Sequence, residues 1–193
     1  MKRKKKQLVN KIILASNSPR RKELLQREGI DFIIDASSIE ETLDDTLPIE
    51  KRLELLAYSK GKPIADKYQQ DIVISADTIV YHNNMIIGKA KDEDEARSIL
   101  SHLSNDCHIV YTAVAIFDKG ECMTFIDATE VYFKDITNLI DDYIKSNDWV
   151  GKAGAYGIQS GGSIFVDYII GDIDTVIGLP VKRVAKILNK KIK

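Results

Sequence analysis

The sequence predicts an α/β protein whose mixed, elongated sheet is flanked by helices and whose two lobes enclose a cleft. Two observations favour this fold. Short apolar, β-branched runs alternate with segments of helical periodicity in the first half of the chain. Two long strand-like runs follow in the second half, joined by the turn 118–121. Because the alternation is typical of parallel strands and the hairpin adds antiparallel ones, the sheet is expected to be mixed.

The first half of the chain predicts the core of this sheet. The run from Asp71 to Val80 is mostly apolar and rich in β-branched residues, so we expect a central strand that is covered on both faces. Pro48 is expected to begin a long helix that ends near residue 68, because leucines recur there at helical spacing. The other elements expected in this half are a strand at 12–14, a helix at 18–28 and a strand at 32–34.

The second half of the chain predicts a long hairpin with helices beside it. Its two strands are expected at 108–118 and 122–133. A glycine-rich loop is expected at 149–163. The other expected elements are helices at 92–103 and 136–145, strands at 163–170 and 174–177, and a basic helix that begins at Pro180.

Length and charge limit the classes of function. The 193 residues suffice for one domain with its own core, which we expect at 11–193 after a basic flexible tail at 1–10. The formal net charge of −1 predicts no affinity for nucleic acid. The tail itself is either a solvated end or a nucleic-acid-binding arm. The apolar run behind it is too short for a signal peptide or a membrane span, so we expect a cytoplasmic protein that does not bind membranes.

The segment from Ser16 to Arg21 indicates an anion site. Ser18 stands at a helix N-cap position and Pro19 at the first helical position. Arg20 and Arg21 then place two cations in a first turn where the helix dipole disfavours them. A bound phosphate would remove that conflict, so we expect the turn at Ser18 and both arginines to bind a phosphorylated substrate. The alternative is a capped surface helix with solvated arginines.

Asp77 lies inside the apolar run that predicts the central strand. A carboxylate buried there without a partner would cost several kcal/mol. It therefore either pairs with a cation for structural reasons, or it acts as a base or metal ligand at a crevice of the sheet. Glu41, in an acidic loop, could join Asp77 around Mg²⁺ or Mn²⁺. The alternative for Glu41 is a solvated loop.

Three lysines are candidates for binding: Lys60 follows the apolar stripe of the long helix, and Lys89 and Lys152 each follow a glycine in a loop. Lys60, Lys89 and Lys152 are each either a surface lysine or part of a cationic pocket that suits a nucleoside triphosphate. Gln159 follows Lys152 in the glycine-rich loop, and its amide could bond a base edge as both donor and acceptor. The alternative is a flexible connector. Neither GxxxxGK[ST] nor GxGxxG occurs, which excludes the common ATPase and dinucleotide motifs.

Several segments resemble one known family in their order along the chain. They include LASNSPRRKELL at 14–25, SADTIVY at 75–81 and KAGAYGIQ at 152–159. Together with the segments between them they resemble the Maf family of nucleotide pyrophosphatases, from about residue 11 to the C-terminal helix. KAGAYGIQ is similar to the branch that hydrolyses dTTP and UTP. In that loop, Gly151 stands where an acidic residue is frequent, and Ser160 stands where the family has glycine.

The resemblance implies a fold shared with inosine-triphosphate pyrophosphatases. It implies hydrolysis between the α- and β-phosphates of dTTP and UTP, which gives the monophosphate and pyrophosphate. It further implies a divalent metal cofactor, Mg²⁺ or Mn²⁺, and a homodimer. Asp77 matches the proton acceptor and Glu41 the acid near metal and substrate. The matching phosphate-side positions are Ser16, Arg20, Arg21, Lys60, Lys89 and Lys152, and those linked to base choice are Arg20, Thr78 and Gln159.

Two alternatives stay open from the sequence. One is a pyrophosphatase that acts on modified pyrimidine nucleotides. The other is a regulator of cell division that binds a nucleotide or nucleic acid without catalysis and uses the basic tail as its contact. Tight, salt-sensitive binding to nucleic acid that is lost on deletion of residues 1–6 would indicate the regulator.

Overall fold

The computed structural model of the protein describes residues 10–36 and 46–191. These residues form a seven-stranded mixed sheet with the strand order β2-β1-β3-β5-β6-β7, and β4 pairs with β3 outside this path. The predicted α/β fold with a mixed sheet is thus confirmed. Residues 1–9 of the tail predicted at 1–10, and also Glu41, lie outside the described residues. The strands are β1 (Ile12–Leu14), β2 (Ile33–Ile34), β3 (Ile72–His82), β4 (Met85–Ile87), β5 (Cys107–Asp118), β6 (Glu121–Phe133) and β7 (Val166–Ile170).

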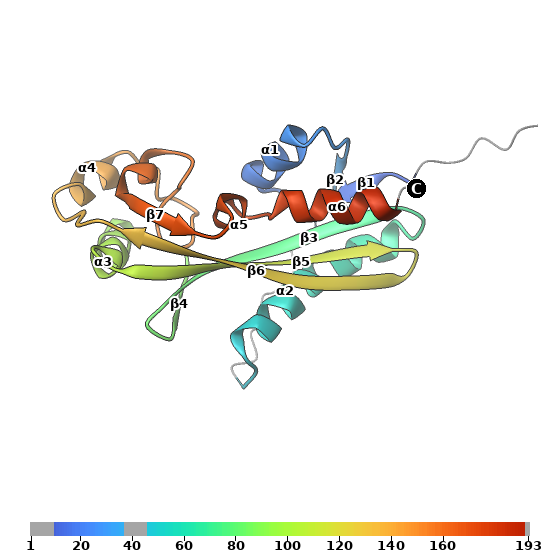
Figure 1. Ribbon diagram of the computed structural model, residues 1–193, viewed down its shortest axis with the longest axis horizontal. Coiled ribbons are helices and arrows are strands. Elements are labelled where there is room, and N and C mark those ends of the chain that lie inside the picture. Colours follow the sequence, from blue (N-terminus) through green and yellow to red (C-terminus); the bar gives the residue numbers. More distant parts are fainter. Residues whose placement is uncertain (1–9, 37–45, 192–193) are drawn as a thin grey trace, which may run out of the picture.

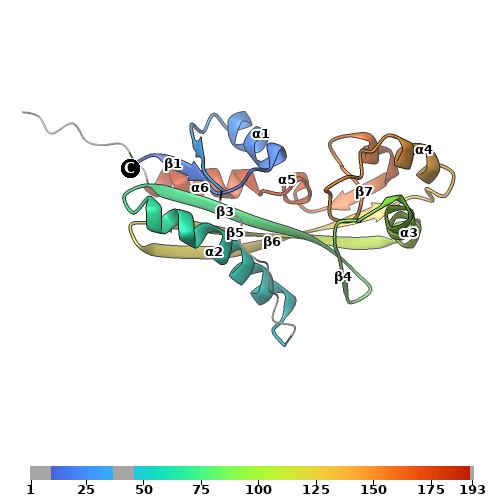
Figure 2. The same ribbon diagram turned by 180° about the vertical axis from the view of Figure 1, so that it is seen from behind.

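The helices lie on both faces of the sheet and at one end of it (Figure 1). Helices α1 and α6 lie over one face, and α2 lies along the opposite face, as the view from behind also shows (Figure 2). Helices α3 and α4 lie at the other end of the molecule together with β7. The helices are α1 (Pro19–Arg27), α2 (Ile49–Lys67), α3 (Glu93–Leu103), α4 (Ile140–Lys145), α5 (Ile173–Ile177) and α6 (Val181–Lys191), with a 3₁₀ turn at Gly161–Phe165.

Strand direction follows the chain connections. Strand β1 pairs in parallel with β2 and with β3, because helices connect these strands. Strands β3, β5, β6 and β7 pair antiparallel in that order. The β5–β6 hairpin closes at Lys119 and Gly120, whose positive φ values of 51° and 86° suit a two-residue turn. Strands β3, β5 and β6 extend from the end of the sheet under α1 and α6 to the end that α3 and α4 cover (Figure 1).

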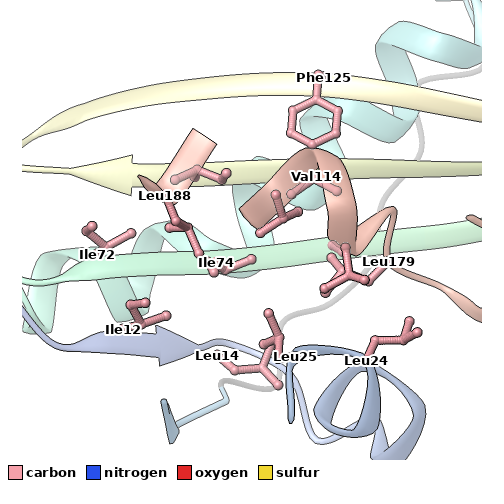
Figure 3. Close-up of a cluster of buried hydrophobic side chains, with 14 of the residues drawn as sticks. Ile12, Leu14, Leu24, Leu25, Ile72, Ile74, Val114, Phe125, Leu179 and Leu188 are labelled. Carbon is pink, nitrogen blue, oxygen red and sulfur yellow. The ribbon is translucent and has the colours of Figure 1, made fainter. Parts of the chain in front are cut away.

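The end of the sheet that carries α1, α2 and α6 forms what we call the first lobe, and alternating side chains divide its core between the two faces of the sheet. Ile12 and Leu14 of β1 face α1 and α6, whereas Ile13 faces α2. Figure 3 shows the first of these clusters, in which Leu24 and Leu25 of α1 lie beside the strand residues. Such a two-sided core explains why the strand runs read as continuously apolar.

The end of the sheet that α3 and α4 cover, which we call the second lobe, has a group of aromatic rings in its core. It contains Phe133, Tyr143, Tyr156 and Phe165, whose rings make tilted or edge-to-face contacts at centroid distances of 4.7–5.7 Å. Helices α3 and α4 pack into the same cluster. Since these rings come from α4, β6 and the glycine-rich loop, the loop is part of the core of this lobe and is not a free connector.

Some predicted elements were wrong. The predicted strand at 174–177 is helix α5, because the Asp172 carboxylate caps the Asp174 amide at 3.1 Å and Gly178, with φ 125°, ends the helix. The start of the strand predicted at 163–170 is the 3₁₀ turn, and β7 begins only at Val166.

Another element, β4, escaped prediction because it is short. It pairs back on β3 through a turn at Asn83 and Asn84, whose φ values of 48° and 62° suit a tight hairpin.

Candidate active site

A cavity of about 730 Å³ lies between the two lobes. The turn before α1, helix α2, strand β3 and the glycine-rich loop all contribute to its lining. All the site residues predicted within the described part of the chain line this one cavity: Ser16, Ser18, Arg20, Arg21, Lys60, Asp77, Thr78, Lys89, Lys152 and Gln159. Their roles stay predictions, and Glu41 lies outside the described residues. We call residues 16–21 with Lys60, Asp77 and Thr78 the strand wall, and Lys89 with residues 150–159 the loop wall.

Arg21 ties three segments of the strand wall together. Its Nε donates to the Gly178 carbonyl oxygen at 2.8 Å, and its two terminal nitrogens donate to Ser16 Oγ at 3.1 Å and to Thr78 Oγ1 at 3.2 Å. These bonds join α1 to β3 and to the end of α5. The arginine therefore has a structural task as well as a place on the cavity, and the turn before α1 is held against the sheet.

A second hydroxyl supports Thr78. Its Oγ1 lies 2.9 Å from Thr112 Oγ1 on the neighbouring strand β5, and Thr112 Oγ1 donates to the Thr175 carbonyl at 2.8 Å. Sequence analysis missed Thr112 and Gly178. Both are distant in sequence from the residues that they contact, so no local motif could have indicated them.

Asp77 lies in the middle of β3, not at its end, and only 8% of its surface is exposed. Its Oδ1 pairs with Lys60 Nζ, which α2 brings across the face of the sheet. The two interpretations that the sequence left open for Asp77 are therefore compatible, since the carboxylate is ion-paired and also lines the cavity.

The metal-binding capacity of the described cavity is limited to one carboxylate. Asp77 is the only acidic residue among the described residues that line it. Among the described residues there is also no cluster of three or more His, Cys, Asp or Glu side chains that could hold a metal ion. One carboxylate still fits Mg²⁺ or Mn²⁺, because these ions take one or two protein carboxylates and complete their coordination with water and substrate phosphates.

The loop wall is joined to the end of β4. Lys89 and Ala153 form an isolated antiparallel bridge, and the Gly154 amide donates to the Gly88 carbonyl at 3.1 Å. Lys89 and Gln159 are exposed and reach the cavity from this side. The loop that carries Gln159 is therefore fixed at its start, contrary to the flexible connector that the sequence left open.

Asp148 holds Lys152 from behind the loop wall. Lys152 Nζ donates to Asp148 Oδ1 at 2.8 Å and also contacts the Asp148 carbonyl oxygen. Burial tends to raise the pKa of Asp148, but hydrogen bonds from Lys152, Ser160 and Tyr143 outweigh it and lower the pKa. Asp148 and Tyr143 were missed by sequence analysis, although the spacing of four residues between Asp148 and Lys152 was a usable signal.

His108 supports the same wall from within the aromatic core. Its Nε2 lies 2.8 Å from the hydroxyl of Tyr156, a residue that lines the cavity. Burial lowers the pKa of His108 to about 3, so the ring is neutral at physiological pH. His108 was also missed, because a lone histidine on a strand carries no local signature.

Comparisons with known proteins agree on one family. The sequence profile of the family described as Maf-like protein matches residues 11–191. A Bacillus cereus protein named dTTP/UTP pyrophosphatase is 44% identical over 189 residues, which cover 97% of this chain and 93% of that protein. A protein of the same name from another Bacillus cereus strain is 45% identical over 183 residues, 94% of this chain and 96% of that protein.

One solved structure is similar at a low level. It is a nucleoside-triphosphatase / dITP/XTP pyrophosphatase from Mycobacterium abscessus, 13% identical, and the match covers 64% of this chain and 74% of that chain with a TM-score of 0.39. Nothing further follows from a score this low.

Within residues 10–36 and 46–191, no helix combines the length and the apolar character that crossing a bilayer requires.

Proposed function

The chain belongs to the Maf-like protein family, and from this premise we propose that it hydrolyses dTTP and UTP to the nucleoside monophosphate and pyrophosphate. One observation carries the proposal. Five cationic side chains from distant parts of the sequence line one cavity around Asp77: Arg20, Arg21, Lys60, Lys89 and Lys152. Such a concentration of positive charge suits a triphosphate, whose charge grows on the departing pyrophosphate during hydrolysis.

In the proposed reaction, the cationic residues bind the phosphate oxygens and fix the α-phosphorus relative to Asp77. The Asp77 carboxylate orients a water molecule and accepts its proton as the water oxygen bonds to the α-phosphorus. The bond from that phosphorus to the bridging oxygen breaks, and pyrophosphate leaves toward the lysines. Most of the rate enhancement would come from positioning and electrostatic stabilisation.

A divalent cation is proposed as cofactor, with Asp77 and Glu41 as its ligands. Bound there with the substrate, Mg²⁺ or Mn²⁺ would neutralise phosphate charge. Gln159 is proposed to meet the pyrimidine, whose carbonyl and ring N–H match the donor and the acceptor of one amide.

We also propose the type of ligand, the oligomeric state and the location of the protein. A free nucleotide is favoured over nucleic acid because the net charge is −1. A homodimer and a cytoplasmic location rest on the family resemblance and on the sequence, and light scattering would test the dimer.

The proposed function is tested with a panel of canonical and modified nucleoside triphosphates, each with Mg²⁺ and with Mn²⁺ and with pyrophosphate as the readout. We expect dTTP and UTP to be hydrolysed fastest and to yield pyrophosphate. Release of orthophosphate instead would contradict cleavage between the α- and β-phosphates. A preference for purines would contradict the assigned base, and faster hydrolysis of methylated pyrimidines would favour the alternative substrate class.

A further inference from the structure

One carboxylate organises the loop that forms the loop wall. Asp148 Oδ1 accepts a hydrogen bond from Lys152 Nζ at 2.8 Å. Its Oδ2 accepts from Ser160 Oγ at 2.7 Å and from the Tyr143 hydroxyl at 3.0 Å. The Tyr143 hydroxyl in turn accepts from the Gly157 amide at 3.2 Å. Asp148 thus connects both ends of the segment 152–160 to helix α4.

The packing around this carboxylate leaves little room for another arrangement. A Cβ added at Gly157 would lie 2.5 Å from Ser160 Oγ and 2.7 Å from Lys152 Cε. A Cβ added at Gly161 would lie 3.2 Å from the Tyr143 ring. The glycines therefore let the loop close tightly over the side chains that bind Asp148.

Asp148 does not itself line the cavity, whereas Lys152 and Gln159 do. Its influence on a bound nucleotide must therefore pass through the residues that it holds. We infer that Asp148 is a positioning residue, which orients the Lys152 ammonium toward the phosphates and keeps the base-side loop in its binding shape. This inference rests on the proposed function of the cavity.

The physical reason lies in the freedom of a lysine side chain. Lys152 has four rotatable carbon–carbon bonds, and only 15% of its side chain is exposed because Asp148 fixes its end. A charge-assisted bond of this kind is stronger than a neutral one and sets a direction. Without the bond to Asp148, the Lys152 ammonium would sample several positions. Nucleotide binding would then have to order this side chain, which lowers the affinity.

The first experiment is a double-mutant cycle with Asp148→Asn and Lys152→Met. Asp148→Asn alone should raise the KM for dTTP about tenfold and change kcat less than about threefold, because Asp148 does not touch the reacting atoms. If Asp148 acts through Lys152, most of that effect should disappear in the Lys152→Met background. An equal effect in both backgrounds would overturn the inference that Asp148 orients Lys152.

The matched control is Asp142→Asn. Asp142 pairs with Lys145 on the same helix, but its side chain is 86% exposed and the pair lies outside the cavity lining. Kinetics of this variant should equal those of the unmodified protein. If Asp148→Asn does not fold, Ser160→Gly removes one of the three bonds to the carboxylate and should raise the KM about two- to threefold. An unchanged KM for Ser160→Gly would then overturn the inference.

A second measurement separates this inference from the proposed function. Native-state hydrogen exchange needs no substrate, and in Asp148→Asn the amides of 152–160 should exchange about tenfold faster than in Asp142→Asn. Unchanged exchange would overturn the positioning role even if dTTP is hydrolysed. Faster exchange in a protein that hydrolyses no nucleotide would instead overturn the proposed function and leave the loop-holding role supported.

Discussion

The two walls of the cavity differ in what fixes their geometry. On the strand wall, Asp77 and Thr78 project from β3, whose backbone is paired with β5 from Ile72 to Tyr81. On the loop wall, Lys152 and Gln159 lie on a loop outside the sheet. Its backbone is bridged to Lys89 at Ala153, and side-chain hydrogen bonds to Asp148 and Tyr143 hold the rest. The proposed chemistry therefore rests on backbone pairing, and the proposed recognition rests mainly on a small polar network. Substitutions in the two walls should therefore change different quantities.

The largest effect is expected at the centre of the strand wall. Asp77→Asn keeps the shape of the side chain but removes its basicity, so kcat for dTTP should fall by about 10²–10⁴. KM should change much less, because the cations that line the cavity are retained. The measurement is steady-state pyrophosphate release by a variant whose folding is verified by circular dichroism.

Asp66→Asn provides the control, since Asp66 pairs with Lys62 on the exposed side of the same helix that carries Lys60. Its kcat should stay within about twofold of the unmodified value. Near-normal kcat in folded Asp77→Asn would remove Asp77 from the role of base and would weaken the contrast between the walls.

Two glycines test how tightly the chain is packed behind the strand wall and within the loop wall. Gly61 of α2 faces β3 and β5, and an added Cβ would lie 2.4 Å from both Ser75 Oγ and the Phe117 ring. Gly61→Val should therefore lower the free energy of unfolding by about 1–3 kcal/mol through overpacking. Gly151 in the loop has φ 70° and no atom within 4 Å of an added Cβ, so Gly151→Ala should cost only about 1 kcal/mol of backbone strain. Urea unfolding of both variants measures the difference, and equal losses would contradict it.

The loop wall should respond to pH through His108. The buried ring has a pKa of about 3, whereas a histidine in the unfolded chain has a pKa of about 6.5. The stability that His108 provides is therefore complete above pH 6.5 and is lost as the pH falls toward 3. Between pH 7 and pH 5 this group alone should lower the free energy of unfolding by about 2 kcal/mol.

His108→Gln tests this pH response, because the amide can still bond the Tyr156 hydroxyl but takes up no proton in this range. Urea unfolding at several pH values should show a shallower decline for the variant than for the unmodified protein. Parallel declines would mean that other groups cause the pH dependence of stability.

The smallest effect is expected at the outer edge of the loop wall. In Gln159→Glu the carboxylate can no longer donate to a base carbonyl, so the kcat/KM for dTTP and UTP should fall about tenfold relative to purine triphosphates. Because Asp77 is unchanged in this variant, kcat should be retained. A panel of nucleoside triphosphates at saturating concentration measures it. An unchanged ranking of substrates would clear Gln159 of base recognition.

Sequence reasoning worked best where one segment carries the signal. The apolar run around Asp77 predicted a central strand, and the serine, proline and two arginines at 18–21 predicted the start of a helix with cations in its first turn. It failed for 174–177, where β-branched residues favoured a strand although a capping aspartate at 172 begins a helix. Local propensity there was weaker than the cap and the glycine that ends the helix.

The residues that support the site were beyond local patterns. Thr112, Asp148 and His108 act through contacts with residues from other segments or within a long loop, and such contacts follow from the fold and not from periodicity. A cationic pocket was one of two interpretations of Lys60, Lys89 and Lys152, because each lysine lies in a different segment and could equally have been on the surface. Glu41 lies outside the described residues, so its place relative to Asp77 stays a prediction.

The long strands have a consequence for how a nucleotide enters and leaves. Strands β3, β5 and β6 run through both lobes (Figure 1). A rotation of one lobe against the other would therefore break backbone hydrogen bonds between several strands at once. Binding and release of a nucleotide would then depend on local motion of the segment near Gln159 and on rotamer changes of the lysines. Such motions are faster than collective hinge movements. We therefore expect that opening and closing of the site do not limit kcat.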